Sequence, residues 1–170
     1  MFRIFFVLLH AVYRKYLMPM QRYFLYFRYD GAAYRGWQVQ PGERTVQGEL
    51  QRALSILLRG DVPVVGAGRT DTGVHARMMV AHFDAAGGLD CRQTVYRLNR
   101  LLPRDIAADR LVPVPAEMHA RFSATSRTYH YYIHTRRDPF LRAYSCEMFY
   151  SLDFDRMNQA AALLLEYDDF

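Results

Sequence analysis

The apolar residues between positions 22 and 114 switch between the two-residue period of strands and the 3.6-residue period of helices, and this order limits the possible folds. Residues 22–29 are rich in aromatic side chains and stop at Asp30-Gly31, which predicts a strand that ends in a turn. Thr45 is a suitable N-cap for a helix that Gly60 would end. The chain is therefore expected to open with a strand followed by a helix.

Four further segments continue this pattern. Residues 62–67 and 78–83 predict two strands joined by a glycine-rich connection, and a helix is predicted from a cap at Asp90 to a stop at Pro103. Residues 106–114 predict a fourth strand. The order βαββαβ is that of the ferredoxin-like fold in the α+β class, which hosts many functions and decides none of them.

The pattern restarts after Pro113 and Pro115. Residues 128–133 predict a strand, and Asp153 or Asp155 would cap a following helix. We therefore expect a ferredoxin-like domain over residues 20–115, followed over residues 116–170 by the start of a second α/β unit that the chain does not complete.

The first nineteen residues imitate a signal peptide, but their apolar run over residues 4–9 is short and is interrupted by His10, Arg14 and Lys15. The run is also too short to span a bilayer. Met20 stands directly before the first predicted strand, so we interpret residues 1–19 as an appended or wrongly assigned leader in preference to an export signal.

Composition indicates a soluble globular protein, since 51% of the 170 residues are apolar. Cys91 and Cys146 lie far apart, without the companions of a disulfide framework or a zinc site, which fits a reducing cytoplasm. The net charge of +5 comes partly from the leader, yet arginines outnumber acids from Arg69 to Arg142, as in an RNA-binding surface. Lys15 is the only lysine, so a general preference for arginine explains the same bias.

The glycine-rich stretch over residues 66–76 holds the best candidates for chemistry, because glycines let a chain turn sharply and deliver side chains into a cleft. In extended backbone Arg69 and Asp71 point to the same side, where a guanidinium would keep the carboxylate ionised, as a nucleophile or base requires. The alternative is a turn in which Asp71 caps backbone amides and Arg69 is solvated. The stretch lacks the spacing of known phosphate-binding loops.

Aromatic residues beside arginines suggest base stacking. Tyr129, Tyr131 and Tyr132 lie near Arg127, although alternate tyrosines on a strand also occur as half-buried sheet residues. Tyr34 and Trp37 allow the same two interpretations. The six histidines, including His75, show no metal-ligand spacing and are interpreted as structural or RNA-contacting residues.

Three blocks in sequence order are similar to those of the tRNA pseudouridine synthase A family, and the resemblance extends over residues 22–170. They are Tyr29-Asp30-Gly31 with Tyr34, Gly36-Trp37-Gln38 and Thr45-Val46-Gln47; Ala67-Gly68-Arg69-Thr70-Asp71-Thr72-Gly73-Val74-His75-Ala76; and His119-Ala120-Arg121-Phe122-Ser123-Ala124-Thr125 with Tyr129. Three ordered blocks are far more specific than any one alone.

The resemblance implies a cytoplasmic isomerase that converts uridine to pseudouridine in the anticodon stem-loop of tRNA, around positions 38–40, as a homodimer and without a cofactor, a metal or a membrane. Asp71 would be the nucleophile, attacking the flipped uridine at the sugar or at the base. Arg69 would pair with Asp71, and Tyr129 would stack on the base and help to remove its C5 proton. Arg127 and His75 are expected to bind the RNA substrate.

Two other classes remain open. A non-catalytic RNA-binding module would use Asp71 only as a turn residue, but the aromatic pattern of such a sheet is absent. A small metabolic enzyme that holds a phosphate is disfavoured by the missing motif. The family continues through a C-terminal unit that completes the cleft and the dimer, so the chain as given is expected to be a catalytically poor or inactive fragment.

Overall fold

The structure of the protein is a computed structural model that describes residues 19–168. The chain divides into two compact units between Arg127 and Thr128. All but the last residue of the leader predicted over residues 1–19 lie outside the described residues. The domain boundary predicted after residue 115 stays a prediction, while residues 116–127 belong to the first compact unit. Among residues 19–168, no helix has the length and apolar character needed to cross a bilayer.

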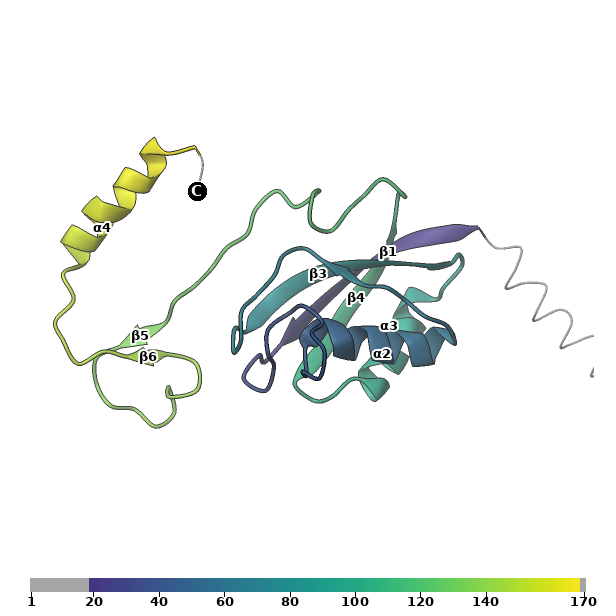
Figure 1. Cartoon of the computed structure of the whole chain (residues 1–170), viewed down its shortest axis with the longest axis horizontal. Coiled ribbons are helices and arrows are strands. Elements are labelled where there is room, and N and C mark those ends of the chain that lie inside the picture. Colours follow the sequence, from purple (N-terminus) through teal and green to yellow (C-terminus); the bar gives the residue numbers. More distant parts are fainter. Residues whose placement is uncertain (1–18, 169–170) are drawn as a thin grey trace, which may run out of the picture. The chain divides into compact units, whose positions relative to one another are not determined.

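The first unit contains a four-stranded sheet with two helices on one face (Figure 1). Its elements are β1 (Met20–Tyr29), α2 (Val46–Leu58), β2 (Val65–Gly66), β3 (Ala76–Ala86), α3 (Cys91–Leu101) and β4 (Ile106–Val114). The strands are ordered β2-β3-β1-β4, and each neighbouring pair is antiparallel. This topology confirms the predicted ferredoxin-like βαββαβ arrangement and the α+β class.

The core of the first unit lies between the sheet and the helices. Alternate residues of the central strand β1 are buried there, each at most 4% exposed: Tyr23, Leu25, Phe27 and Tyr29. They form one cluster with apolar residues of both helices, among them Val46, Leu50, Ala53 and Leu54 of α2 and Leu98 of α3. Because this close packing joins the sheet to both helices, it fixes the positions of the strand ends from which the loops start.

Both helices of the first unit begin at the predicted caps. The side chain of Thr45 accepts a hydrogen bond from Gly48 N, and that of Asp90 accepts one from Gln93 N. α3 ends directly before Leu102 and Pro103, close to the predicted stop. At the end of α2 the left-handed position falls on Arg59, with φ 56° and ψ 48°, and not on the glycine that follows it.

β2 is much shorter than the strand predicted over residues 62–67, because only Val65 and Gly66 pair with β3. Pro63 has no N–H to donate, and β2 lies at the edge of the sheet, where a proline is tolerated. Val62 and Val64 are nevertheless buried in the core. The chain therefore reaches residue 66 in a fixed position although the pairing begins late.

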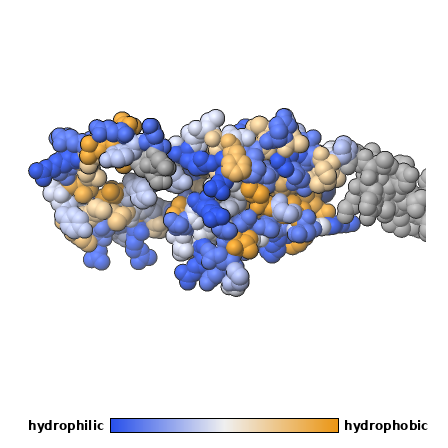
Figure 2. Space-filling model, turned by 45° about the horizontal axis from the view of Figure 1, so that its top comes forward, coloured by the Kyte–Doolittle hydropathy of each residue, from blue (hydrophilic) through white to orange (hydrophobic). Residues whose placement is uncertain are grey.

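The second unit contains β5 (Ile133–His134), β6 (Cys146–Glu147), α4 (Phe154–Leu163) and the 3₁₀ helix η1 (Leu164–Glu166). The strand predicted over residues 128–133 is wrong except at Ile133, because a strand needs a hydrogen-bonded neighbour and β6 pairs only with residues 133 and 134. The predicted helix is confirmed, with Asp153 as its cap. No residue of α4 is buried, and apolar side chains of this unit lie on its surface (Figure 2).

Arg59 offers a test of the end of α2. Glycine adopts a positive φ without steric cost, so Arg59→Gly is expected to raise the free energy of unfolding by about 1 kcal/mol, while the β-branched Arg59→Val is expected to lower it. Urea unfolding of the three proteins measures both changes. A glycine variant that is no more stable than the wild type would contradict a left-handed residue 59.

Candidate active site

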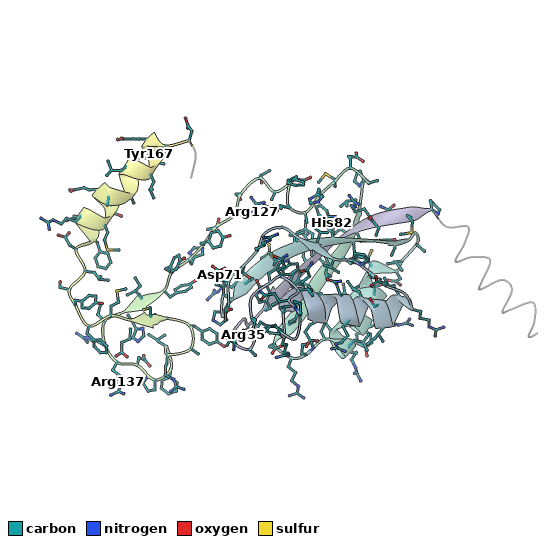
Figure 3. The ribbon with its side chains drawn as sticks, in the orientation of Figure 1. Arg35, Asp71, His82, Arg127, Arg137 and Tyr167 are labelled. Atoms are coloured by element: carbon teal, nitrogen blue, oxygen red, sulfur yellow. The ribbon has the colours of Figure 1, made fainter. Side chains whose placement is uncertain are left out.

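Asp71 lies in a segment over residues 66–76, which we call the aspartate loop; it runs from the last residue of β2 through the connection to the first residue of β3. Val74 N donates to Asp71 O at 3.2 Å, and Gly73 has a φ of 79°, so the chain turns sharply after Asp71. The Asp71 side chain is exposed at the edge of the first unit (Figure 3). Within residues 19–168 no hydrogen bond or ion pair engages its carboxylate. Both carboxylate oxygens are therefore available to a ligand.

The aspartate loop rests on the loop over residues 30–45 between β1 and α2, which we call the support loop. Trp37 N donates to Thr70 O at 2.9 Å, and Gly73 N donates to Tyr34 O at 3.3 Å. The hydroxyl of Tyr29, at the end of β1, lies 2.8 Å from Thr70 Oγ1. These bonds hold the backbone on both sides of Asp71, so an exposed side chain stands on a fixed main chain.

Two glycines let the loops approach each other this closely. A Cβ on Gly36, whose φ is 85°, would lie 2.5 Å from Thr70 O. A Cβ on Gly66 would lie 2.5 Å from the indole ring of Trp37. Neither distance is possible for a real Cβ, so any larger residue at these positions would force the loops apart.

The support loop is itself anchored through Tyr34, which is 1% exposed. Its hydroxyl donates to Asp105, and Arg44 lies over its ring, 4.4 Å from the centroid, while donating to the hydroxyl oxygen at 3.0 Å. Burial and the bond to Asp105 raise the pKa of Tyr34, which keeps the phenol a donor. Trp37 is also buried, at 3% exposed, so both aromatics are core residues and not stacking surfaces for a base.

His75 connects the far end of the aspartate loop to the start of the support loop. Its Nδ1 lies 2.9 Å from Asp30 Oδ1 and 3.1 Å from Gly31 N. A neutral Nδ1 accepts from Gly31, whereas a protonated one donates to Asp30, so the two contacts are alternatives for one nitrogen. In either state the ring ties residue 75 to residues 30 and 31.

The other residues predicted for the site differ in their placement. Arg69, exposed in the aspartate loop, forms no ion pair with Asp71 within the described residues, so that pairing stays a prediction. Arg127 belongs to the first unit, where its guanidinium donates to backbone carbonyls of Ala67 and Arg121. Tyr129 belongs to the second unit and is 61% exposed.

The segment over residues 115–127, which we call the clip segment, packs on the sheet face opposite the helices through His82, one of the six histidines interpreted from the sequence as structural or RNA-contacting. His82 of β3 is 5% exposed, and its Nδ1 accepts from Ala120 N at 3.1 Å. Burial, with the charge of Arg22 and the ring of His119 nearby, lowers the pKa of His82 to about 4. A histidine inside an alternating strand pattern carries no sequence signal for this role, because its partner is a backbone amide.

Arg22 fixes the start of the same segment. It donates two hydrogen bonds of 2.8 Å to Asp84, its partner in the β1–β3 register, and one of 2.7 Å to Ala116 O. Its bond to Asp84 lowers the pKa of that carboxyl, so the pair stays ionised.

Among residues 19–168, no three His, Cys, Asp or Glu side chains are grouped closely enough to hold a metal ion.

Comparison with known proteins gives a consistent result. The tRNA pseudouridine synthase family matches residues 26–123, a range that contains the support loop and the aspartate loop. Proteins named tRNA pseudouridine synthase A are similar to the chain. The one from Bacteroides thetaiotaomicron is 55% identical over 151 residues, which are 89% of this chain and 56% of that protein.

Two other relatives of the same name extend this similarity. The protein from Parabacteroides distasonis is 52% identical over 152 residues, covering 89% of this chain and 60% of its own length. The protein from Bacillus subtilis is 43% identical over 146 residues, covering 84% of this chain and 59% of its own length. The chain thus spans between 56% and 60% of the length of these relatives.

Gly36 and Gly42 form a matched pair that tests the contact between the loops. Both have positive φ, 85° and 75°, but a Cβ on Gly42 would meet nothing within 4 Å. Gly36→Ala is therefore expected to lower the free energy of unfolding by roughly 2 kcal/mol more than Gly42→Ala, which carries only the backbone cost. Urea unfolding measures the difference, and equal effects would contradict the close approach to Thr70.

His82 predicts a pH dependence of stability. Its ordinary pKa is 6.5 and its folded pKa about 4, so between these values the unfolded chain binds a proton that the folded chain does not. The contribution of neutral His82 to the free energy of unfolding is therefore complete above pH 6.5. It decreases as the pH falls toward 4, by at most about 1.4 kcal/mol per pH unit.

His82→Asn keeps an acceptor for Ala120 N but does not titrate, so its free energy of unfolding is expected to fall less on acidification than that of the wild type. Urea unfolding at pH 7, 5.5 and 4.5 measures the two slopes, with His130→Asn, an exposed histidine, as the control. Parallel pH profiles for wild type and His82→Asn would show that His82 is not held neutral.

Proposed function

Since the chain belongs to the tRNA pseudouridine synthase family, we propose that it is part of an enzyme that isomerises uridine to pseudouridine in the anticodon stem-loop of tRNA, with Asp71 as the nucleophile. The observation that carries this proposal is an exposed carboxylate on a main chain held by Trp37, Tyr34 and Tyr29. A cytoplasmic location, a homodimer and the target positions 38–40 belong to the same proposal and rest on the family resemblance alone.

The formation of pseudouridine requires an accessible carboxylate on a fixed main chain. The bond between the sugar and N1 breaks, the uracil turns, and a new bond forms from the sugar to C5, while C5 loses a proton and N1 gains one. Atoms and electrons balance within the nucleotide, so no external reactant is consumed. A carboxylate that attacks at the sugar or at the base must be ionised, accessible and precisely held, since displacement by about 1 Å costs roughly a hundredfold in rate.

An exposed carboxylate on a fixed backbone meets these demands better than a turn residue would. An aspartate that only stabilises a turn uses its oxygens to accept from nearby amides, as Asp90 and Asp153 do at their helices. Within the described residues Asp71 accepts no such bond; its turn is closed through its backbone carbonyl. This difference favours catalysis over the alternative of a non-catalytic RNA-binding module.

The remaining roles follow from position. Arg69, two residues before Asp71, would pair with the carboxylate once RNA is bound and help to keep the uridine out of the stack. Tyr129 would stack on the base and assist removal of the C5 proton. Because Nδ1 of His75 already faces Asp30 and Gly31, we propose that His75 contacts the RNA through the rest of its ring.

Asp71→Asn tests the proposal in the complete protein. The amide keeps the shape of the side chain but loses the nucleophilic charge, so pseudouridine formation is expected to fall by roughly a thousandfold or more, with unchanged folding and tRNA binding. Asp61→Asn, at an exposed aspartate outside both loops, is the matched control and should keep wild-type activity.

The measurement is pseudouridine at each anticodon-arm position of a defined tRNA under single-turnover conditions. Turnover by Asp71→Asn near that of Asp61→Asn would exclude Asp71 as the nucleophile. A wild-type protein that binds tRNA but forms no pseudouridine would favour the binding module.

A further inference from the structure

We infer that Arg127 is a positioning residue, whose guanidinium holds the start of the aspartate loop in place, and not a residue that binds the RNA directly. Its Nε and Nη2 donate to Ala67 O at 3.1 and 2.9 Å, and Nη2 also donates to Arg121 O at 2.6 Å. The catalytic consequence of this inference rests on the proposed function of Asp71, whereas the effect on the loop does not.

The contact falls where the aspartate loop leaves the sheet. Ala67 N donates to Val80 O of β3 at 2.8 Å, which is the last ladder bond before the loop. The Ala67 carbonyl has left the ladder and is bound by Arg127 instead. Ala67 is thus held at its N–H by the sheet and at its C=O by the guanidinium.

The side chain of Arg127 also lies along the next residue. A Cβ on Gly68 would be 3.5 Å from Nε and 3.7 Å from Cδ of Arg127, which is ordinary van der Waals contact. The arginine therefore covers Ala67 and Gly68, while Trp37 and Tyr29 hold Thr70. Only Arg69 lies between these two fixed points, and Asp71 follows the second.

The guanidinium of Arg127 can hold the aspartate loop because the clip segment that carries it is itself bonded to the sheet. Within the clip segment Ser123 N donates to His119 O at 2.8 Å, and His119 N donates to Ser123 Oγ at 3.0 Å. Ala120 N is bound by His82, so this turn is fastened to the sheet. Arg127 thereby joins a segment that follows β4 to the loop that follows β2.

Charge and geometry distinguish this role from phosphate binding. No ion pair engages Arg127 within the described residues, and its positive charge is directed at two carbonyl dipoles. The guanidinium donates to two carbonyls from two nitrogens held in one plane, whereas the three donors of a lysine lie on a single nitrogen and cannot reproduce this fork. Because Nε and Nη2 are both engaged, a bidentate phosphate contact through that edge of the guanidinium would require these bonds to open.

The test compares Arg127→Gln and Arg127→Lys with wild type in the complete protein, and Arg121→Gln, an exposed arginine of the same segment, controls for lost charge. Hydrogen–deuterium exchange of the amides in residues 68–74 without RNA is expected to be roughly tenfold faster in Arg127→Gln, intermediate in Arg127→Lys and unchanged in Arg121→Gln. The kcat for pseudouridine formation is expected to fall about 10- to 100-fold in Arg127→Gln, with KM nearly unchanged.

Unchanged loop exchange, together with weaker tRNA binding and a salt slope reduced by about one, would overturn the inference and make Arg127 a phosphate-binding residue. If the loop exchanges faster in Arg127→Gln but the wild-type protein forms no pseudouridine, the positioning role of Arg127 is retained and the proposed function is rejected. Arg127→Lys guards against misfolding of the glutamine variant, since it keeps the charge and most of the stem.

Discussion

The close packing of the support loop against the aspartate loop is the contact on which the position of Asp71 depends. Its main part is a contact between backbones, since Trp37 N reaches Thr70 O at 2.9 Å because Gly36 has no Cβ. In addition, the backbone of Gly66 lies against the indole side chain of Trp37. Backbone contacts of this kind leave little room for side-chain rearrangement. They therefore allow a carboxylate to be open to solvent and yet stand on a rigid support, a combination that side-chain packing alone would not provide.

Further contacts connect these two loops to the rest of the first unit. Tyr34 ties the support loop to the turn before β4 through Asp105, and Tyr29 ends a strand whose other inward residues form the core. On the opposite face, His82 and Arg22 hold the clip segment, and that segment supplies Arg127 to the start of the aspartate loop. The ferredoxin-like sheet thus supports the aspartate loop, to which both the support loop and the clip segment are bonded.

The fold of the first unit could be predicted because its signals are local. Thr45 and Asp90 cap helices through bonds three residues away, and the alternation in β1 separates its buried and exposed sides without knowledge of the partner strands. The strand predicted over residues 128–133 was wrong except at Ile133, because tyrosines at alternate positions favour a strand but cannot supply the neighbour it must pair with. The candidate site divides in the same way. Asp71 and Arg69 stand out in a glycine-rich stretch, whereas the roles of His82 and Arg127 arise from bonds to backbone atoms distant in sequence, which leave no pattern in residue types.

The central claim is that Asp71 acts directly on the uridine, and the most direct measurement is one distance in a structure of the complete protein bound to a tRNA anticodon stem-loop. The account predicts the target uridine turned out of the stack, with a carboxylate oxygen of Asp71 about 3 to 3.5 Å from the sugar or base carbon that it attacks. A uridine turned out and held near another carboxylate, with Asp71 still facing solvent, would contradict it.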